Sequence, residues 1–207
     1  LAAYGLYCLG KQIWKEKTPA LLAALIFLTY PGFAQQYIAT VYGHFFLVLS
    51  AFFFSLAFSL MAVRSPDRGR GWLLHTMALL LSAVNLFSME YFFMLELLRP
   101  VLFWVVMWDK SVPVRQQLVT VSKRWLPYFL IFLVAGFWRA FLFDYQTNNY
   151  EVGLLELLRA NPLQTILTLL GTVLWDLWQT LLKVWGVMLQ FPGLEEFGPR
   201  AWMIMLV

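Results

Sequence analysis

The sequence predicts an all-α, polytopic membrane protein of about six spans, with truncated helices at both ends. Two observations predict this class. Of the 207 residues, 61% are hydrophobic and only 13% are charged, and a soluble domain of this size has too little interior to bury so much apolar surface. Apolar runs of about 18 or more residues also recur along the chain, as is typical of helices that cross a bilayer.

Basic residues divide the chain into spans and connections. They gather in three polar connections, formed by Lys11, Lys15 and Lys17, then by Arg64, Arg68 and Arg70, and then by Lys110, Arg115, Lys123 and Arg124. The positive-inside rule assigns all three connections to the cytoplasmic side. Spans are then expected at residues 19–30, 42–63, 72–90, 91–108, 125–143 and 163–189. Residues 72–108 can form two helices or one bent helix. The net charge of +4 thus reflects orientation, and we expect no nucleic-acid partner.

The two ends of the chain both resemble interrupted helices. The opening "LAAYGLYCLG" is too short to span a bilayer, and "AWMIMLV" closes the chain in the same way. We therefore expect residues 1–207 to be a single transmembrane helical domain and a fragment of a longer protein. The single Cys8 excludes an internal disulfide. No metal-ligand spacing or cofactor motif is evident, and a need for a divalent metal stays open.

The segment "TYPGFAQQYIATVYGHFF", residues 29–46, interrupts the apolar pattern. The rise over residues 19–30 is only about 18 Å, short of a core of about 30 Å. Pro31 must end or kink this helix, because proline cannot continue the hydrogen-bond ladder. Polar side chains follow on the predicted outer side, namely Gln35, Gln36, Thr40 and His44. They fit an ordinary outer loop or the wall of an outward-facing cavity, where irregular polar backbone survives at membrane depth.

Several ionisable residues fall within or next to the spans, where charge is costly and indicates function or a structural pair. Glu96 and Arg99 are spaced i,i+3 and can pair on one helix face, so a structural ion pair is favoured over catalysis there. Other charges lie at predicted outer ends, namely Glu90, Arg139, Asp144 and Arg159. Arg159 belongs to an amphipathic segment, residues 145–162, that is either a solvated connector or a loop covering an outer active site.

A polar stripe runs along the expected span 163–189. Its members follow one another by three or four positions, namely Thr165, Thr168, Thr172, Asp176, Gln179 and Lys183. This spacing places them on one helix face. Polar side chains on such a face join helices in a bundle, and the same stripe also suits a proton or ion path. Asp176 and Lys183 are expected to satisfy each other through Gln179 or a neighbouring helix.

Residues 1–90 resemble the central membrane region of GT-C glycosyltransferases of the protein O-mannosyltransferase-like type. In that family a helix ends in an aliphatic-Gly-basic turn, followed by "ALLAAL", a Pro, an outer segment with a Tyr, and a long apolar helix ending in Arg. The matching residues are Leu9, Gly10, Lys11, residues 20–25, Pro31, Tyr42 and Arg64. The family's acidic motif lies in its first outer loop, which would precede Leu1.

The resemblance implies an enzyme that transfers a sugar from a polyprenyl-phosphate donor on the outer side of the membrane. It implies a carboxylate base, for which Glu90 and Asp144 are the candidates here. It also implies groups that hold the phosphate or line the cavity, for which the candidates are Arg99, Arg139, Arg159, Gln35, Gln36, Tyr42 and His44. The implied partners are membrane lipid, the lipid-linked donor, an unidentified acceptor and other membrane subunits.

Two further hypotheses stay open beside the glycosyltransferase. One is a transporter or channel subunit whose path follows Asp176, Gln179 and Lys183, and the other is a non-catalytic membrane scaffold. The sequence contains no Asn-X-Ser/Thr glycosylation sequon. Together with the resemblance to this family, this predicts that the protein is located in the inner membrane of a bacterium.

Overall fold

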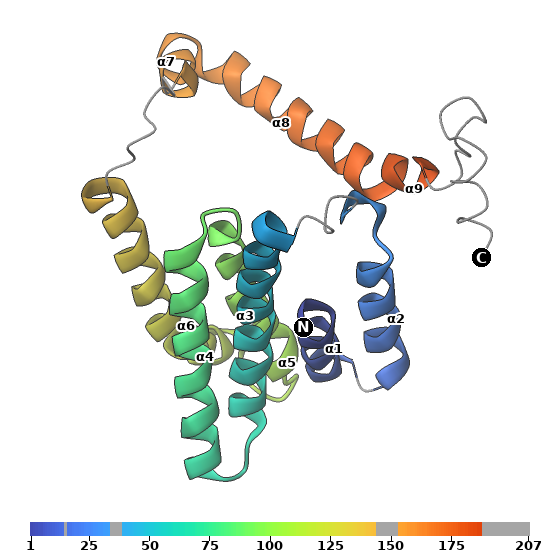
Figure 1. Cartoon of the computed structure of the whole chain (residues 1–207). Helices are drawn as coiled ribbons and strands as arrows, with labels where there is room; N and C mark the ends of the chain where they lie inside the picture. The colour runs from blue at the N-terminus through green and yellow to red at the C-terminus, as the bar shows by residue number, and fades with distance from the viewer. Residues whose placement is uncertain (15, 34–38, 144–152, 188–207) are drawn as a thin grey trace, which may run out of the picture. The chain divides into compact units, whose positions relative to one another are not determined.

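The computed structural model describes residues 1–14, 16–33, 39–143 and 153–187 (Figure 1). Every regular element in these residues is a helix, which confirms the all-α prediction. The chain divides into two compact units, Leu1–Thr29 with Gln35–Tyr145, and Tyr30–Ala34 with Gln146–Val207. Each unit is described by itself.

The first unit contains the larger number of helices. In chain order they are α1 (Ala2–Ile13), α2 (Lys17–Leu28), α3 (Ala39–Arg64), α4 (Arg68–Ser88), the 3₁₀ turn η2 (Phe93–Leu97), α5 (Leu98–Met107), α6 (Val114–Phe137) and the π-helical turn η3 (Trp138–Leu142). The second unit holds the 3₁₀ turn η1 (Pro31–Phe33), α7 (Gly153–Ala160), α8 (Pro162–Trp178), the π-helical turn η4 (Gln179–Lys183) and α9 (Val184–Val187).

Among the described residues, four helices are long and apolar enough to cross a membrane, which indicates a membrane protein with several spans. They are Tyr42–Arg64, Arg68–Ser88, Val114–Leu142 and Pro162–Gly186. The expected number of about six is not confirmed, because two of the expected spans form shorter helices. The helix α2 has 12 residues and ends at Leu28, before Pro31, and α5 has 10 residues.

Residues 72–108 form two helices and not one bent helix. Met89 has extended backbone angles, with φ −144° and ψ 139°, and it ends α4. The chain then re-enters helical structure through η2 and α5. Pro100 lies in the first turn of α5, where its missing N–H costs no hydrogen bond.

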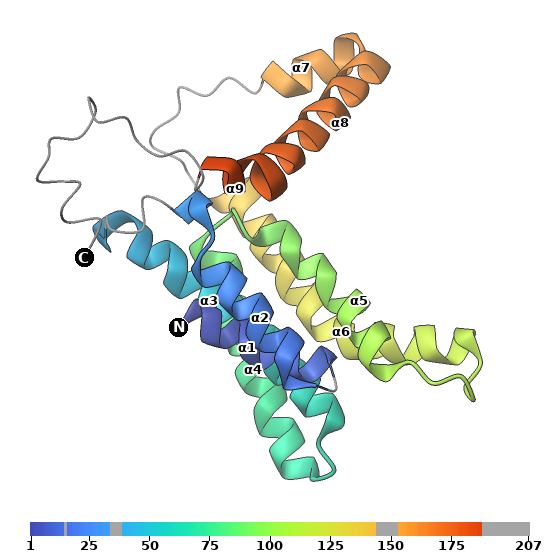
Figure 2. The same ribbon diagram turned by 90° about the vertical axis from the view of Figure 1, so that its right-hand side faces the viewer.

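The core of the first unit forms around α3. More than half of the most apolar part of this span is buried, a larger share than in the other three spans. It packs against α1 and α4, while α6 packs against α4 and α5 (Figures 1 and 2). Large apolar side chains fill the contacts, among them Phe52, Leu56, Leu60 and Phe103. The predicted cytoplasmic turn between α3 and α4 is short, so these two helices are antiparallel neighbours.

Small residues bring α3 and α4 close together. The hydroxyl of Ser55 donates a hydrogen bond of 2.6 Å to the carbonyl oxygen of Ala78. A Cβ added to Gly71 would lie 3.4 Å from the carbonyl oxygen of Ala62. Small side chains allow such close backbone approach inside a membrane, where dispersion and polar contacts hold helices together. This approach positions the buried polar groups described below.

Within the second unit, Tyr30 and η1 pack against η4 and α9. The hydroxyl of Tyr30 donates a 2.8 Å hydrogen bond to the carbonyl oxygen of Thr180. Its ring also lies edge-on to Trp185, with the ring centres 6.0 Å apart. The sequence predicts that Pro31 ends or kinks the helix, and α2 does end before it, at Leu28. The contact of Tyr30 with a segment 150 positions away has no local signal.

Candidate functional site

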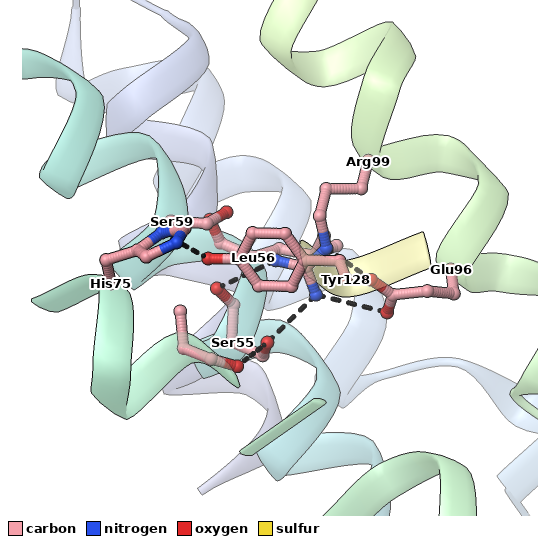
Figure 3. Close-up of polar contacts among 8 residues, drawn as sticks. Ser55, Leu56, Ser59, His75, Glu96, Arg99 and Tyr128 are labelled. Atoms are coloured by element: carbon pink, nitrogen blue, oxygen red, sulfur yellow. Dashed lines mark hydrogen bonds and ion pairs between the residues drawn. The ribbon is translucent and has the colours of Figure 1, made fainter. Parts of the chain in front are cut away.

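Glu96 and Arg99 form a buried ion pair, as their spacing predicts (Figure 3). The Arg99 side chain is 0% exposed and that of Glu96 is 1% exposed. Nε of Arg99 donates to one oxygen of Glu96, and Nη2 donates to the other at 3.0 Å. Nη2 also donates to the hydroxyl of Ser55 at 2.9 Å, and Nη1 donates to the carbonyl oxygen of Ser55 at 3.3 Å. Both carboxylate oxygens and all three guanidinium nitrogens therefore have partners.

Tyr128 covers the guanidinium group of Arg99. The distance from the guanidinium carbon to the centre of the Tyr128 ring is 3.9 Å, which is a close cation–π contact. The tyrosine is fully buried, and its hydroxyl is hydrogen-bonded to Nδ1 of His75 at 3.0 Å. A connected series of side chains thus leads from Glu96 through Arg99 and Tyr128 to His75 (Figure 3).

This series lies at the middle of the candidate spans. Ser55, Ala78 and Tyr128 are each near the centre of their own span. An isolated charge at this depth is costly, and a charge that is paired and hydrogen-bonded is tolerated. The arrangement joins α3, α5 and α6 through Arg99, so its evident physical role is to fix these helices together. The guanidinium group faces Glu96 and Ser55 rather than an open cavity.

A second ion pair joins the ends of two spans. Arg139 lies on η3, at the end of α6, and its Nη2 contacts Oε2 of Glu90, which lies two residues beyond the end of α4. The Glu90 side chain is 47% exposed and that of Arg139 is 21% exposed. The guanidinium carbon of Arg139 also lies 5.1 Å from the centre of the Phe143 ring. A predicted catalytic carboxylate and a predicted phosphate-binding cation are therefore side by side, at the end of the spans that is predicted to be outer.

The structure describes only some of the other predicted cavity residues. Gln35, Gln36 and Asp144 lie outside the described residues. Tyr42 and His44 are on the first turns of α3, with Tyr42 half-buried and His44 exposed. Arg159 is exposed on α7, in the other unit.

The polar stripe on the last span is exposed in the second unit. Asp176 and Lys183 are exposed and Gln179 is half-buried, and no ion pair joins Asp176 to Lys183. The threonine hydroxyls donate to carbonyl oxygens four positions earlier in the same helix, at 2.8 to 3.0 Å, as seen for Thr165, Thr168 and Thr172. Hydrogen bonds within α8 thus satisfy the hydroxyls of Thr168 and Thr172, and the Thr165 hydroxyl also donates to the carbonyl oxygen of Leu157 on α7 at 3.0 Å.

The sequence does not predict the contacts that Ser55, Tyr128 and His75 make in and beside the buried series. Ser55 reaches Arg99 across 44 positions, and Tyr128 reaches His75 across 53. Ser55 lies in the apolar run of the second expected span, where an isolated hydroxyl is a weak signal of a helix contact. Tyr128 follows Trp125 and resembles an interfacial aromatic residue. His75 is 53 positions from Tyr128, and the contact between them cannot be found from spacing.

No group of three or more His, Cys, Asp or Glu side chains in the described residues is arranged to hold a metal ion. Within the part of the chain that the structure describes, the candidate site consists of two ion pairs, one buried at mid-span and one at the predicted outer end. The chain matches no protein-family model, no curated protein and no solved structure.

Proposed function

We propose that the chain is the membrane part of a GT-C-like glycosyltransferase that uses a polyprenyl-phosphate sugar donor on the outer side of the membrane. The proposal rests on the resemblance of residues 1–90 and on one observation, the contact between Glu90 and Arg139. An ionised carboxylate beside a cation, at the end of two apolar spans, has the chemistry that such a transfer requires.

Each member of the pair has a separate role in the proposed reaction. The acceptor hydroxyl oxygen attacks the anomeric carbon of the sugar, and the bond from that carbon to the phosphate oxygen breaks. Glu90 takes the hydroxyl proton as general base. The leaving polyprenyl phosphate departs with the electron pair, and Arg139 stabilises its growing negative charge. A partly exposed pair suits this use, because the carboxylate and the guanidinium group can turn toward a substrate.

Arg139→Ala tests this assignment in the full chain, purified and reconstituted in lipid. The assay follows release of labelled sugar from a panel of polyprenyl-phosphate-linked hexoses and pentoses. Loss of one group that stabilises transition-state charge lowers turnover by about 10²–10³-fold, so Arg139→Ala should be nearly inactive. Glu90→Gln keeps the shape of the side chain and removes its basicity, so it should also be nearly inactive.

Matched controls remove equal charge elsewhere. Lys110→Ala and Glu16→Gln alter exposed residues of the predicted cytoplasmic connections and should retain activity. Full transfer by Arg139→Ala would remove that residue from the mechanism. Failure of the unaltered protein to cleave any donor of the panel would overturn the glycosyltransferase proposal as a whole.

We also infer a bacterial inner membrane location and about six spans within residues 1–207. On this proposal the shorter apolar helices α2 and α5 lie within the membrane beside the four long spans. Other membrane subunits remain candidate partners. Epitope tags and membrane fractionation of the native protein test the location, and recovery of the protein outside the inner-membrane fraction would contradict it.

A further inference from the structure

A polar pocket lies at the turn between α3 and α4, at the end of the spans opposite to Glu90. Its volume is about 280 Å³. Its polar and aromatic lining comes from α4, α6 and the turn, namely from Ser65, Asp67, Arg68, Trp72, His75 and Arg124. Nothing in the proposed sugar transfer uses this pocket, because that reaction takes place at the other end of the spans.

The pocket carries excess positive charge. Arg68 and Arg124 are both exposed, and neither forms an ion pair with any described residue. The one acidic group, Asp67, is occupied as the N-cap of α4. Its two carboxylate oxygens accept hydrogen bonds from the N–H groups of Gly69 at 3.0 Å and Arg70 at 3.4 Å. The pocket therefore has two guanidinium groups available for an anion.

The depth of the pocket matches that of lipid headgroups. Trp72 lines it, and Trp125 directly follows Arg124 on α6. Tryptophan is enriched at the membrane–water interface. The residues of α6 before Trp125 are mostly polar, and those after it are apolar, so Arg124 lies where this helix enters the membrane. The basic residues nearby predict that this interface is cytoplasmic, the side on which anionic lipids concentrate.

His75 gives the pocket a fixed inner wall. Its Nδ1 is hydrogen-bonded to the hydroxyl of Tyr128, which is itself buried against Arg99. The imidazole orientation is thus determined by the buried series and does not depend on a ligand. A pocket wall held in place before binding lowers the entropic cost of binding.

A second basic pocket adjoins the same turn. It has a volume of about 210 Å³ and is lined in part by Gln12, Arg64, Ser65 and Arg70. Ser65 contributes to both pockets. Arg64 and Arg70 line this second pocket and Arg68 and Arg124 line the first, so four arginines line two pockets that share Ser65.

We propose that the pocket lined by Arg68 and Arg124 binds the phosphate of an anionic phospholipid headgroup in the cytoplasmic leaflet. Guanidinium groups bind phosphate oxygens through paired hydrogen bonds, and basic pockets between membrane helices on this side bind acidic headgroups. Trp72 packs against the glycerol region, and the acyl chains lie along the apolar surfaces of α4 and α6. The proposal stands independently of the sugar transfer.

Binding of short-chain phosphatidylglycerol to the purified full chain in detergent tests the proposal by native mass spectrometry. Phosphatidylcholine of the same chain length and sodium phosphate are measured in parallel. The unaltered protein should bind phosphatidylglycerol more tightly than phosphatidylcholine. Arg68→Gln/Arg124→Gln should weaken phosphatidylglycerol binding by about tenfold or more, and each single variant should show part of the loss.

The matched control, Lys110→Gln/Arg115→Gln, removes the same charge from exposed residues that line neither pocket. It should retain the preference for phosphatidylglycerol. An equal loss in both double variants would mean diffuse surface attraction and would overturn the site, as would unchanged binding by the pocket variant. Binding of sodium phosphate without binding of phosphatidylglycerol would overturn the lipid assignment. Unfolding temperatures of all variants verify that each is folded.

Discussion

At the scale of single residues, Arg99 shows how a membrane protein retains a buried charge. Its guanidinium group is neutralised by Glu96, hydrogen-bonded to Ser55 and covered by the ring of Tyr128. Removing one partner of such a pair leaves the other charge buried and uncompensated, which costs more than the pair contributes when it is intact.

Arg99→Met should therefore destabilise the protein by about 3–5 kcal/mol, because Glu96 loses its counter-charge. The measurement is the free energy of unfolding in mixed micelles of mild detergent and dodecyl sulfate. The double variant Glu96→Leu/Arg99→Met removes both charges and should be more stable than Arg99→Met alone. A single variant with the stability of the unaltered protein would show that the pair does not join these helices.

Tyr128 makes two contacts that substitutions can separate. Tyr128→Phe keeps the ring over Arg99 and loses the hydrogen bond to His75, for a cost of about 1 kcal/mol. Tyr128→Leu also loses the cation–π contact, which contributes up to about 2 kcal/mol more when it is desolvated. The same unfolding measurement compares them, and equal stability of the two variants would mean that the ring–guanidinium contact contributes nothing.

Asp109, in the exposed connection between α5 and α6, offers a test in pH. Its Oδ1 accepts hydrogen bonds from the backbone N–H of Ser111 at 2.9 Å and from the Ser111 hydroxyl at 2.7 Å. Both bonds favour the ionised carboxylate and lower the pKa of Asp109, with the backbone bond as the larger cause. The folded connection thus gains stability above the ordinary carboxyl pKa and loses it as the pH falls through the lowered pKa.

Ser111→Ala removes the hydroxyl bond and keeps the backbone bond, so the pKa of Asp109 should rise part of the way to its ordinary value. Carboxyl carbon shifts in an NMR titration measure this change. Ser111→Thr retains a hydroxyl and should leave the pKa low. An identical pKa in Ser111→Ala would assign the whole effect to the backbone.

The residue scale also marks the limit of sequence reasoning. The Glu96–Arg99 pair follows from local spacing, and the structure confirms that it forms. The sequence indicates Glu90 as a candidate base and Arg139 as a candidate phosphate-binding residue. Their contact depends on how α4 and α6 pack, which the sequence does not reveal. The partners Ser55, Tyr128 and His75 also depend on that packing, which no local pattern reveals.

At the scale of elements, hydropathy predicts the long spans well and the short helices less well. Residues 42–63 and 163–189 are expected spans and correspond closely to candidate spans of the structure. Residues 19–30 and 91–108 are apolar enough for a membrane, but neither range forms a long helix. The helix α2 ends before Pro31, and the extended backbone at Met89 separates α4 from the helical residues that follow. Composition measures polarity, whereas helix ends depend on single residues and their tertiary contacts.

Gly10 determines how closely α1 and α2 can pack. A Cβ at Gly10 would lie 2.8 Å from Cβ of Ala20 and 3.0 Å from the Trp14 ring. Gly10→Ala must therefore push α2 away, and it should destabilise the protein by about 1–3 kcal/mol. Gly171→Ala is the control, since its Cβ meets no described atom within 4 Å and alanine favours a helix. Chemical unfolding measures both, and an equally stable Gly10→Ala would contradict the close approach.

At the scale of the whole molecule, the positive-inside rule predicts one orientation for all spans. Cysteine labelling tests it in a Cys8→Ser background with a membrane-impermeant maleimide. Tyr91→Cys, at a position 74% exposed near the end of α4, should react in intact cells. Lys110→Cys, in the connection between α5 and α6, should react only after the membrane is permeabilised. The reverse pattern would invert the topology and move the proposed lipid pocket to the outer leaflet.

The closeness of Glu96 and Arg99 in the chain has a consequence for biogenesis. The two residues are three positions apart, so the nascent segment can neutralise its own charge within one helical turn, before α6 is synthesised. Such a segment can leave the translocation machinery with a lower insertion cost than a lone arginine would impose. Ser55, on α3, is already synthesised when the pair emerges, whereas Tyr128, on α6, is synthesised after it. The charge of Arg99 is therefore compensated by Glu96 before the Tyr128 ring is available to cover it.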